Sequence, residues 1–352
     1  MGQNKNSLAR FINGRKYIRE FSEEFAAKNG CNPREIEKDI IEAKKYNHIS
    51  LGEYEWTGFH DLTQEQKKTV STLWTRSEFR KKFTDRRYIG TLMNKYIFSK
   101  VFADYYGRKC VQTADVTEDV LKMLAEGKGQ VVYKPNCKGQ GEGVCVLPAA
   151  GKAEIEETLQ YIKTHGNGIV EEYICQDDAM EMMNPRAVSI VRFYSVSSPY
   201  GMYLFAPVFT TAMYKDIANG CQDALTAMAD IRSGIVLTDA VDQLNNEEYE
   251  VHPVTGTAFR GFQINHWDET IAMMKKAVPL AKRISNIGWD VAITKDGPLI
   301  IEANTIPGFN TAQYKGYSHL TEGYGYQPLF DAVYDKGFRD DGRYEKVVLK
   351  ID

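Results

Sequence analysis

The 352-residue chain lacks most of the features that assign a protein to a class at first sight. It has no apolar run near the ~20 residues that a membrane-spanning helix needs, and its most apolar short run, 202–209, is interrupted by Pro207. The amino terminus has no apolar segment of the kind found in signal peptides, and Asn6 stands where a myristoylation signal has Ser or Thr. We therefore expect a cytoplasmic protein with no membrane span.

The cysteines and the charge exclude further classes. Six cysteines, at positions 31, 110, 137, 145, 175 and 221, include no CxxC pair and no metal-type spacing, which favours free thiols in a reducing compartment. A net charge of −3 leaves no strongly basic domain to neutralise a phosphate backbone, so nucleic acid is not an expected partner. With 43% hydrophobic and 26% charged residues, the composition is that of a globular protein long enough for about two domains.

Residues 1–88 have helical patterns. Asn32 is followed by a proline and then, at the third helical position, by a glutamate, which together form a strong helix start. A similar capping sequence begins at Thr63. We expect 51–62, which lies between these two helices, to be a loop, and Gly14 to break the first helix.

From residue 89 the pattern changes to alternating strands and helices. A predicted strand over 130–135 ends in Lys134-Pro135, and the glycine-rich loop 138–143 connects it to another apolar strand. Backbone amides approach phosphate oxygens closely only where side chains are absent, and a neighbouring lysine adds positive charge. The sequence has neither a GxxxxGK[ST] P-loop nor a GxGxxG motif, so this loop predicts another kind of phosphate site, with a merely flexible hairpin as the alternative.

The stretch 286–310 is predicted to form a β-hairpin. A three-residue loop at 295–297 would place Asp290 directly opposite Glu302. The same register puts four apolar residues on one face of the hairpin: Val291, Ile293, Leu299 and Ile301.

The opposed acids of this hairpin indicate a metal site. Two carboxylates directly opposite each other repel and destabilise the strand pair unless a cation lies between them. Asn304 adds a third oxygen ligand on the face of Glu302, and hard oxygen ligands suit Mg²⁺. An ordinary surface hairpin with solvated acids is the alternative.

An acid at the end of one strand, E-x-N at the end of the next and the Pro-Gly turn at 307–308 resemble the metal-binding hairpin of the ATP-grasp superfamily. The strand, lysine, glycine loop and strand over 130–147 resemble the lid of the same proteins. HPVTG at 252–256 and GWDVAI at 288–293 are similar to the branch called sugar-transfer associated ATP-grasp. The resemblance implies an α/β (α+β) fold of two α+β lobes enclosing ATP, divided into an N-terminal helical region over 1–88, a small lobe with the lid over 89–174 and a large lobe with the metal hairpin over 175–352.

The resemblance also implies the cofactors ATP and Mg²⁺ and roles for individual residues. The implied metal ligands are Asp290, Glu302 and Asn304. The implied ATP contacts are Lys95, Lys134, Lys138, Gly139, Gly141 and Gly143 at the phosphates, Glu171, Glu172, Tyr173 and Ile174 at the adenine edge, and Asp178 at the ribose. Lys95 follows Asn94, where the family usually has an acid. The candidate catalytic residues are Arg192, Arg283 and Asn310, and a structural ion pair is the alternative role for Arg192.

The function that the resemblance implies is an ATP-dependent carboxylate-amine ligase. Such an enzyme would join a small-molecule acid to an amine through an acyl phosphate, and the branch suggests a sugar acid or an amino acid in surface-polysaccharide synthesis. A kinase acting on a hydroxyl needs the same phosphate site, and a non-catalytic ATP-binding protein is a third hypothesis. The sequence leaves the oligomeric state open, with a homodimer as one option.

Overall fold

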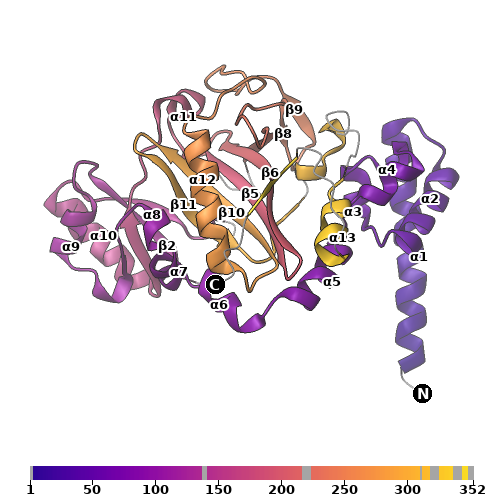
Figure 1. Ribbon diagram of the computed structural model, residues 1–352, viewed down its shortest axis with the longest axis horizontal. Helices are drawn as coiled ribbons and strands as arrows, with labels where there is room; N and C mark the ends of the chain where they lie inside the picture. The colour runs from indigo at the N-terminus through magenta and orange to yellow at the C-terminus, as the bar shows by residue number, and fades with distance from the viewer. Residues whose placement is uncertain are drawn as a thin grey trace. The chain divides into compact units, whose positions relative to one another are not determined.

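The computed structural model describes residues 3–136, 141–215, 223–309, 311–317, 325–335 and 343–347 (Figure 1). The chain forms two compact units: unit 1 contains Met1–Lys82 and Gln313–Phe338, and unit 2 contains Phe83–Ala312 and Arg339–Asp352. No helix in the described part of the chain combines the length and the apolar character that crossing a membrane requires.

Unit 1 is helical. Asn32 caps its second helix and Thr63 forms a capping box at its fourth, as predicted. Two other predictions are wrong, because the first helix continues through Gly14 and 51–62 begins with a helix. The helices of unit 1 are α1 (Gln3–Asn29), α2 (Pro33–Tyr46), α3 (Leu51–Trp56), α4 (Gln64–Thr69), α5 (Leu73–Phe83) and α13 (Gln327–Asp335).

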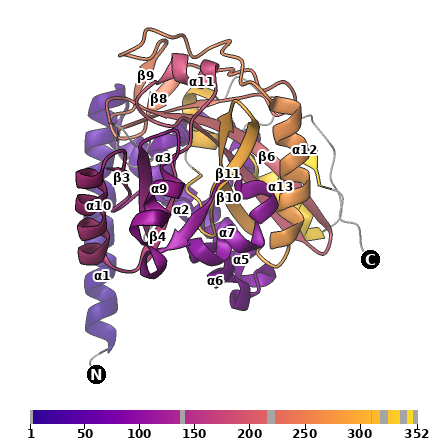
Figure 2. The same ribbon diagram turned by 90° about the vertical axis from the view of Figure 1, so that its left-hand side faces the viewer.

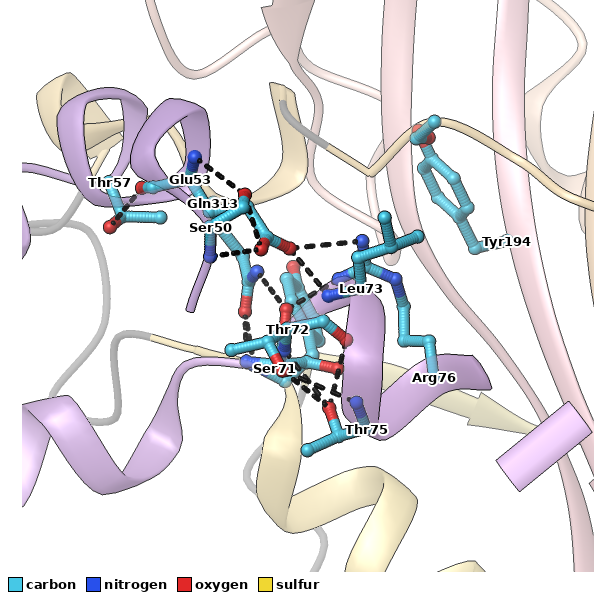
Figure 3. A network of polar contacts seen from close by, with 12 residues as sticks. Ser50, Glu53, Thr57, Ser71, Thr72, Leu73, Thr75, Arg76, Tyr194 and Gln313 are labelled. Atoms are coloured by element: carbon cyan, nitrogen blue, oxygen red, sulfur yellow. Dashed lines mark hydrogen bonds and ion pairs between the residues drawn. The ribbon is translucent and has the colours of Figure 1, made fainter. Parts of the chain in front are cut away.

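A network of polar contacts explains the unexpected helix and joins the two stretches of unit 1 (Figure 3). Ser50 and Glu53 form a capping box at the start of α3, a signal that the sequence analysis overlooked. Glu53 Oε1 also accepts a hydrogen bond from the backbone of Leu73 at 2.5 Å. The Gln313 amide donates to the carbonyl of Ser71 at 2.9 Å and accepts from its N–H at 2.8 Å. Gln313, in the second stretch of unit 1, therefore satisfies the backbone N–H and C=O of Ser71 in the first.

Unit 2 mixes helices and strands, which confirms the predicted fold class. Its helices are α6 (Ile89–Met93), α7 (Lys95–Val101), α8 (Ala103–Tyr106), α9 (Glu118–Leu124), α10 (Lys152–His165), α11 (Asp178–Met183) and α12 (Trp267–Ala277). Its strands are β1 (Cys110–Gln112), β2 (Gln130–Pro135), β3 (Cys145–Pro148), β4 (Gly168–Glu172), β5 (Ile190–Ser198), β6 (Gly201–Ala212), β7 (Ala224–Met228), β8 (Ala240–Asp242), β9 (Glu247–Tyr249), β10 (Asn286–Thr294), β11 (Gly297–Asn304) and β12 (Tyr344–Lys346).

The smaller sheet of unit 2 has the strand order β1-β4-β2-β3, with all pairs antiparallel. One face packs against α9 and α10 through a core that includes Val131 and Tyr133 (Figure 2). Because side chains alternate along a strand, Val132 and Lys134 point to the opposite face. Glu171 of β4 pairs with Val132 and lies on that same face. The sheet therefore presents a lysine and an acid on the side away from α9 and α10.

The larger sheet has the order β11-β10-β5-β6-β7-β8-β9, and β12 pairs with β6. Val291 and Ile300 belong to the core that includes residues of α12, the helix drawn in orange beside β10 and β11 in Figure 1. Alternation places Asp290 on the opposite face of β10 from Val291. The faces that point away from α9, α10 and α12 thus carry the charged residues of the two sheets.

The hairpin of β10 and β11 confirms that Asp290 is opposite Glu302. The predicted loop length is wrong, since Thr294 pairs with Gly297 and leaves a two-residue turn, 295–296. A β-bulge at Ile301 adds one residue to β11 and compensates for the shorter turn. The two differences cancel at the acids and at the pairs beyond them, up to Gly288 and Asn304, whereas the pairs between the bulge and the turn are shifted by one residue.

The bulge changes the predicted apolar faces. Val291 pairs with Ile300 and both enter the main core, whereas Leu299 pairs with Ala292 and packs in a small cluster on the other face. Ile301 contacts that second cluster as well. The prediction that Leu299 and Ile301 share the face of Val291 is therefore wrong, because a one-residue shift moves every side chain to the opposite face.

Candidate functional site

A pocket in unit 2 is lined by residues of both sheets. Its apolar walls are formed by Val132, Val144 and Val146 near the small sheet and by Val188, Ile190 and Ile301 near the large one. The other seven described lining residues are all predicted site residues: Lys134, Gly141, Glu171, Tyr173, Ile174, Asp290 and Glu302. Apolar walls with a few charged groups are typical of small-molecule sites.

The charged group on the small-sheet side is an ion pair. Lys134 Nζ lies 2.5 Å from Glu171 Oε1, and the lysine is mostly buried. Arg108 Nε lies 3.2 Å from the same oxygen, and the Tyr106 hydroxyl donates to Oε2. Burial alone would raise the pKa of Glu171, but the charges of Arg108 and Lys134 and the hydrogen bonds lower it to about 2. Glu171 is therefore an anion that the protein has already neutralised.

Arg108 and Tyr106 are contributors that the sequence analysis missed. They flank Gly107, whose positive φ of 62° ends α8. An arginine next to a helix-ending glycine gives no signal of its own, because nothing nearby in the sequence shows where its side chain goes. Its partner Glu171 is 63 positions further along the chain.

On the hairpin side, Asp290 is bound by Arg192. Nε and Nη2 of the guanidinium donate to the two carboxylate oxygens, each at 2.6 Å. Burial lowers the pKa of Arg192, but the charge of Asp290 and these hydrogen bonds raise it well above its ordinary value. The cation beside Asp290 is thus an arginine of the chain, as the alternative role for Arg192 anticipated.

Two of the predicted metal ligands, Asp290 and Glu302, line the pocket, and Asn304 is not among its described lining residues. Glu302 faces Asp290 across the strand pair, and Asn304 Nδ2 donates to Glu302 Oε1 at 3.2 Å. Carboxylate and amide oxygens fit Mg²⁺. Within the described ranges, no three His, Cys, Asp or Glu side chains converge on a common point, so the set depends on the amide of Asn304.

Gly141, within the predicted glycine loop, adopts a positive φ of 69° and lines the pocket. Gly143 follows with a φ of 74°. Residues with a side chain rarely adopt this backbone conformation, which accounts for glycine at both positions. The predicted residues Lys138, Gly139 and Asn310 lie outside the described residues.

Besides Arg192, Asn304 and Gly143, four predicted site residues are not among the described lining residues of the pocket. Glu172 accepts a hydrogen bond from the backbone of Lys109 at 2.7 Å. The Asp178 carboxylate lies 2.7 Å from Lys295 Nζ at the hairpin turn. The two remaining residues are Lys95, whose N–H donates to Asn136, and Arg283, whose guanidinium lies 5.8 Å from the ring centre of Tyr88.

Comparison with known proteins gives one family and several distant structures. A family model described as sugar-transfer associated ATP-grasp matches residues 75–323. No curated protein matches the chain. Three solved structures are similar: the ATP-grasp ligase PsnB complexed with minimal precursor (14% identity, 72% of this chain and 64% of that chain, TM-score 0.43), the ADP complex of purK, N5-carboxyaminoimidazole ribonucleotide synthetase (13%, 62% and 46%, 0.39), and the D-alanine-D-alanine ligase from Coxiella burnetii (13%, 62% and 49%, 0.38). The chain spans less than two thirds of the length of each.

Proposed function

The chain belongs to the sugar-transfer associated ATP-grasp family, and from this premise we propose that it is an ATP-dependent ligase joining a carboxylate to an amine. The observation that supports the proposal is the convergence of Lys134, Gly141 and the opposed pair Asp290 and Glu302 on one pocket. These residues come from two separate parts of the sequence, the β2–β3 segment and the β10–β11 hairpin. Their meeting supplies a cation and a close backbone approach for phosphates beside oxygen donors for a metal ion.

In this proposal the pocket holds ATP. The valines of β2 and β3 and the segment of Tyr173 and Ile174 contact the adenine, while Lys134 and the glycine loop at Gly141 contact the phosphates. Glu302 and Asn304 would hold Mg²⁺. Asp290 would be a further ligand once Arg192 releases at least one of the Asp290 carboxylate oxygens. Bound there, Mg²⁺ would neutralise phosphate charge.

The proposed reaction has two steps. A carboxylate oxygen of the acid attacks the γ-phosphorus of ATP, and the bond from this phosphorus to the β,γ-bridging oxygen breaks. ADP departs, and the acid is now an acyl phosphate. The amine then attacks the acyl carbon, and phosphate departs with its bonding electrons while the amine loses a proton, which leaves an amide. Arg192, placed beside Asp290, would contact the transferred phosphate or the acid. The acid proposed is a sugar acid or an amino acid of surface-polysaccharide synthesis.

The test is a trap for the acyl phosphate. The protein is incubated with ATP, Mg²⁺, hydroxylamine and pools of sugar acids and amino acids, while ADP, phosphate and new masses are followed together. A hydroxamate formed with release of phosphate supports the ligase and identifies the acid. A phosphorylated compound without hydroxamate would instead assign a kinase reaction, and a Glu302→Gln variant is the control for contaminating ATPases.

A further inference from the structure

Arg108 is the most completely enclosed arginine near the pocket. Its side chain is 3% exposed, and it is not among the described residues that line the pocket. A buried guanidinium needs partners for its charge and its five N–H groups. Its partners therefore indicate what it does.

Backbone carbonyls hold Arg108 in place. Nη1 donates to the carbonyls of Tyr106 at 2.9 Å and Ile300 at 3.1 Å, and Nη2 donates to that of Ile301 at 3.2 Å. β11 is an edge strand that bulges at Ile301, so carbonyl groups there need a donor from outside the sheet. The ring of Tyr106 also lies 3.6 Å from the guanidinium carbon. Arg108 cannot move without leaving these groups unsatisfied.

Lys134 differs from Arg108 in this respect. Both contact Oε1 of Glu171, but Lys134 lines the pocket and reaches it on a flexible chain. If Lys134 were the sole cation beside Glu171, its turning away would leave a completely buried carboxylate without a counter-charge, which is costly. With Arg108 fixed beside the same oxygen, the carboxylate keeps a cation when Lys134 leaves.

We propose that Arg108 is a positioning residue that neutralises Glu171 so that Lys134 can bind the terminal phosphates of the nucleotide. The inference rests on the proposed function, because it takes the phosphates as the ligand of Lys134. Two cations and one anion leave a net positive charge at this wall of the pocket. Without Arg108, the lysine would be kept by Glu171 and the wall would be neutral.

The experiment compares ATP with AMP by calorimetry, since the ratio of their affinities isolates the contribution of the outer phosphates. In Arg108→Met, Lys134 should stay with Glu171 and no longer bind the outer phosphates. Losing this bond to a charged group should lower the ratio about tenfold or more, while AMP binds as before. Adding Glu171→Gln to that variant removes the anion that holds Lys134. The double variant should therefore regain the ratio of the unmodified protein, which a purely structural role of Arg108 does not predict.

Each outcome has a distinct meaning. An unmodified protein without phosphate-dependent affinity would contradict the proposed function itself. An unchanged ratio in Arg108→Met, or a loss that Glu171→Gln does not restore, would overturn the role of Arg108 and leave the proposed function intact. Should Arg108→Met not fold, Glu171→Gln alone decides, because it frees Lys134 with Arg108 in place and must keep or raise the ratio; a lower ratio overturns the inference.

Discussion

Arg192 binds both carboxylate oxygens of Asp290 at 2.6 Å, from the strand on the other side of β10 from Glu302. Asp290 is therefore flanked within one sheet by a cation and by a second acid. The repulsion expected between two opposed carboxylates is relieved by this arginine. Asp290 and Glu302 would be equivalent as metal ligands, but we expect their removal to have different effects on the stability of the protein.

Replacing these two acids by alanine should give different effects on stability. Asp290→Ala leaves a largely buried guanidinium without its partner and should lower the free energy of unfolding by about 1–3 kcal/mol, while Glu302→Ala should change it little. Both should lose ATP turnover by roughly 1000-fold, the loss of several kcal/mol of charge stabilisation. Urea unfolding and an ADP assay measure the two effects.

The matched control for this comparison is the double variant Arg192→Met and Asp290→Ala, which removes the whole pair and should recover part of the lost stability. Full ATP turnover in either single variant would show that the acids do not serve the reaction.

Lys134→Met should weaken ATP binding about tenfold or more in calorimetry, since it removes the cation that lines the pocket. The protein should remain folded, because Arg108 still neutralises Glu171. Lys128→Met changes an exposed lysine of the same lobe and serves as the control. Equal affinities in the two variants would mean that the phosphate site has been misassigned.

Glu171 should make stability depend on pH in the acid range. Its pKa is lowered in the folded protein to about 2, from an ordinary value of 4.5, so its ionised form stabilises the fold above about pH 4.5. That contribution is lost as the pH falls from about 4.5 towards 2. Between about pH 6 and pH 3, urea unfolding should show a larger loss of stability in the unmodified protein than in Glu171→Gln. Parallel pH profiles would contradict the assignment.

Gly288 should tolerate no side chain. A Cβ there would lie 2.7 Å from Cβ of Pro307, which follows β11. We expect Gly288→Ala to destabilise unit 2 by about 1–3 kcal/mol, the usual cost of overpacking. Gly90→Ala, in the helix α6 with open space around it, should be neutral or stabilising by up to about 1 kcal/mol in the same measurement. Similar losses in both variants would rule out the contact with Pro307 as the cause.

The site shows which features could be predicted from the sequence. The opposition of Asp290 and Glu302 follows from strand alternation and was predicted correctly, although the turn is one residue shorter and the bulge at Ile301 one residue longer than expected. The pairing in a hairpin depends on residues that are close together in the sequence, so it can be predicted from them. Arg108 could not be found in that way, because it binds Ile300, 192 residues further along the chain. Such partners are set by packing.

Unit 1 is formed by two stretches that are far apart in the sequence, Met1–Lys82 and Gln313–Phe338, which has a consequence for its biosynthesis. Ser71 emerges from the ribosome long before its partner Gln313, and Trp56 and Phe79 likewise precede the rings they pack against, Tyr314 and Phe330. The contiguous stretch Phe83–Ala312 of unit 2 is synthesised in between. We therefore expect helices α1 to α5, which are synthesised before Phe83–Ala312, to acquire their final packing only after that stretch is made, with apolar surface exposed to chaperones meanwhile.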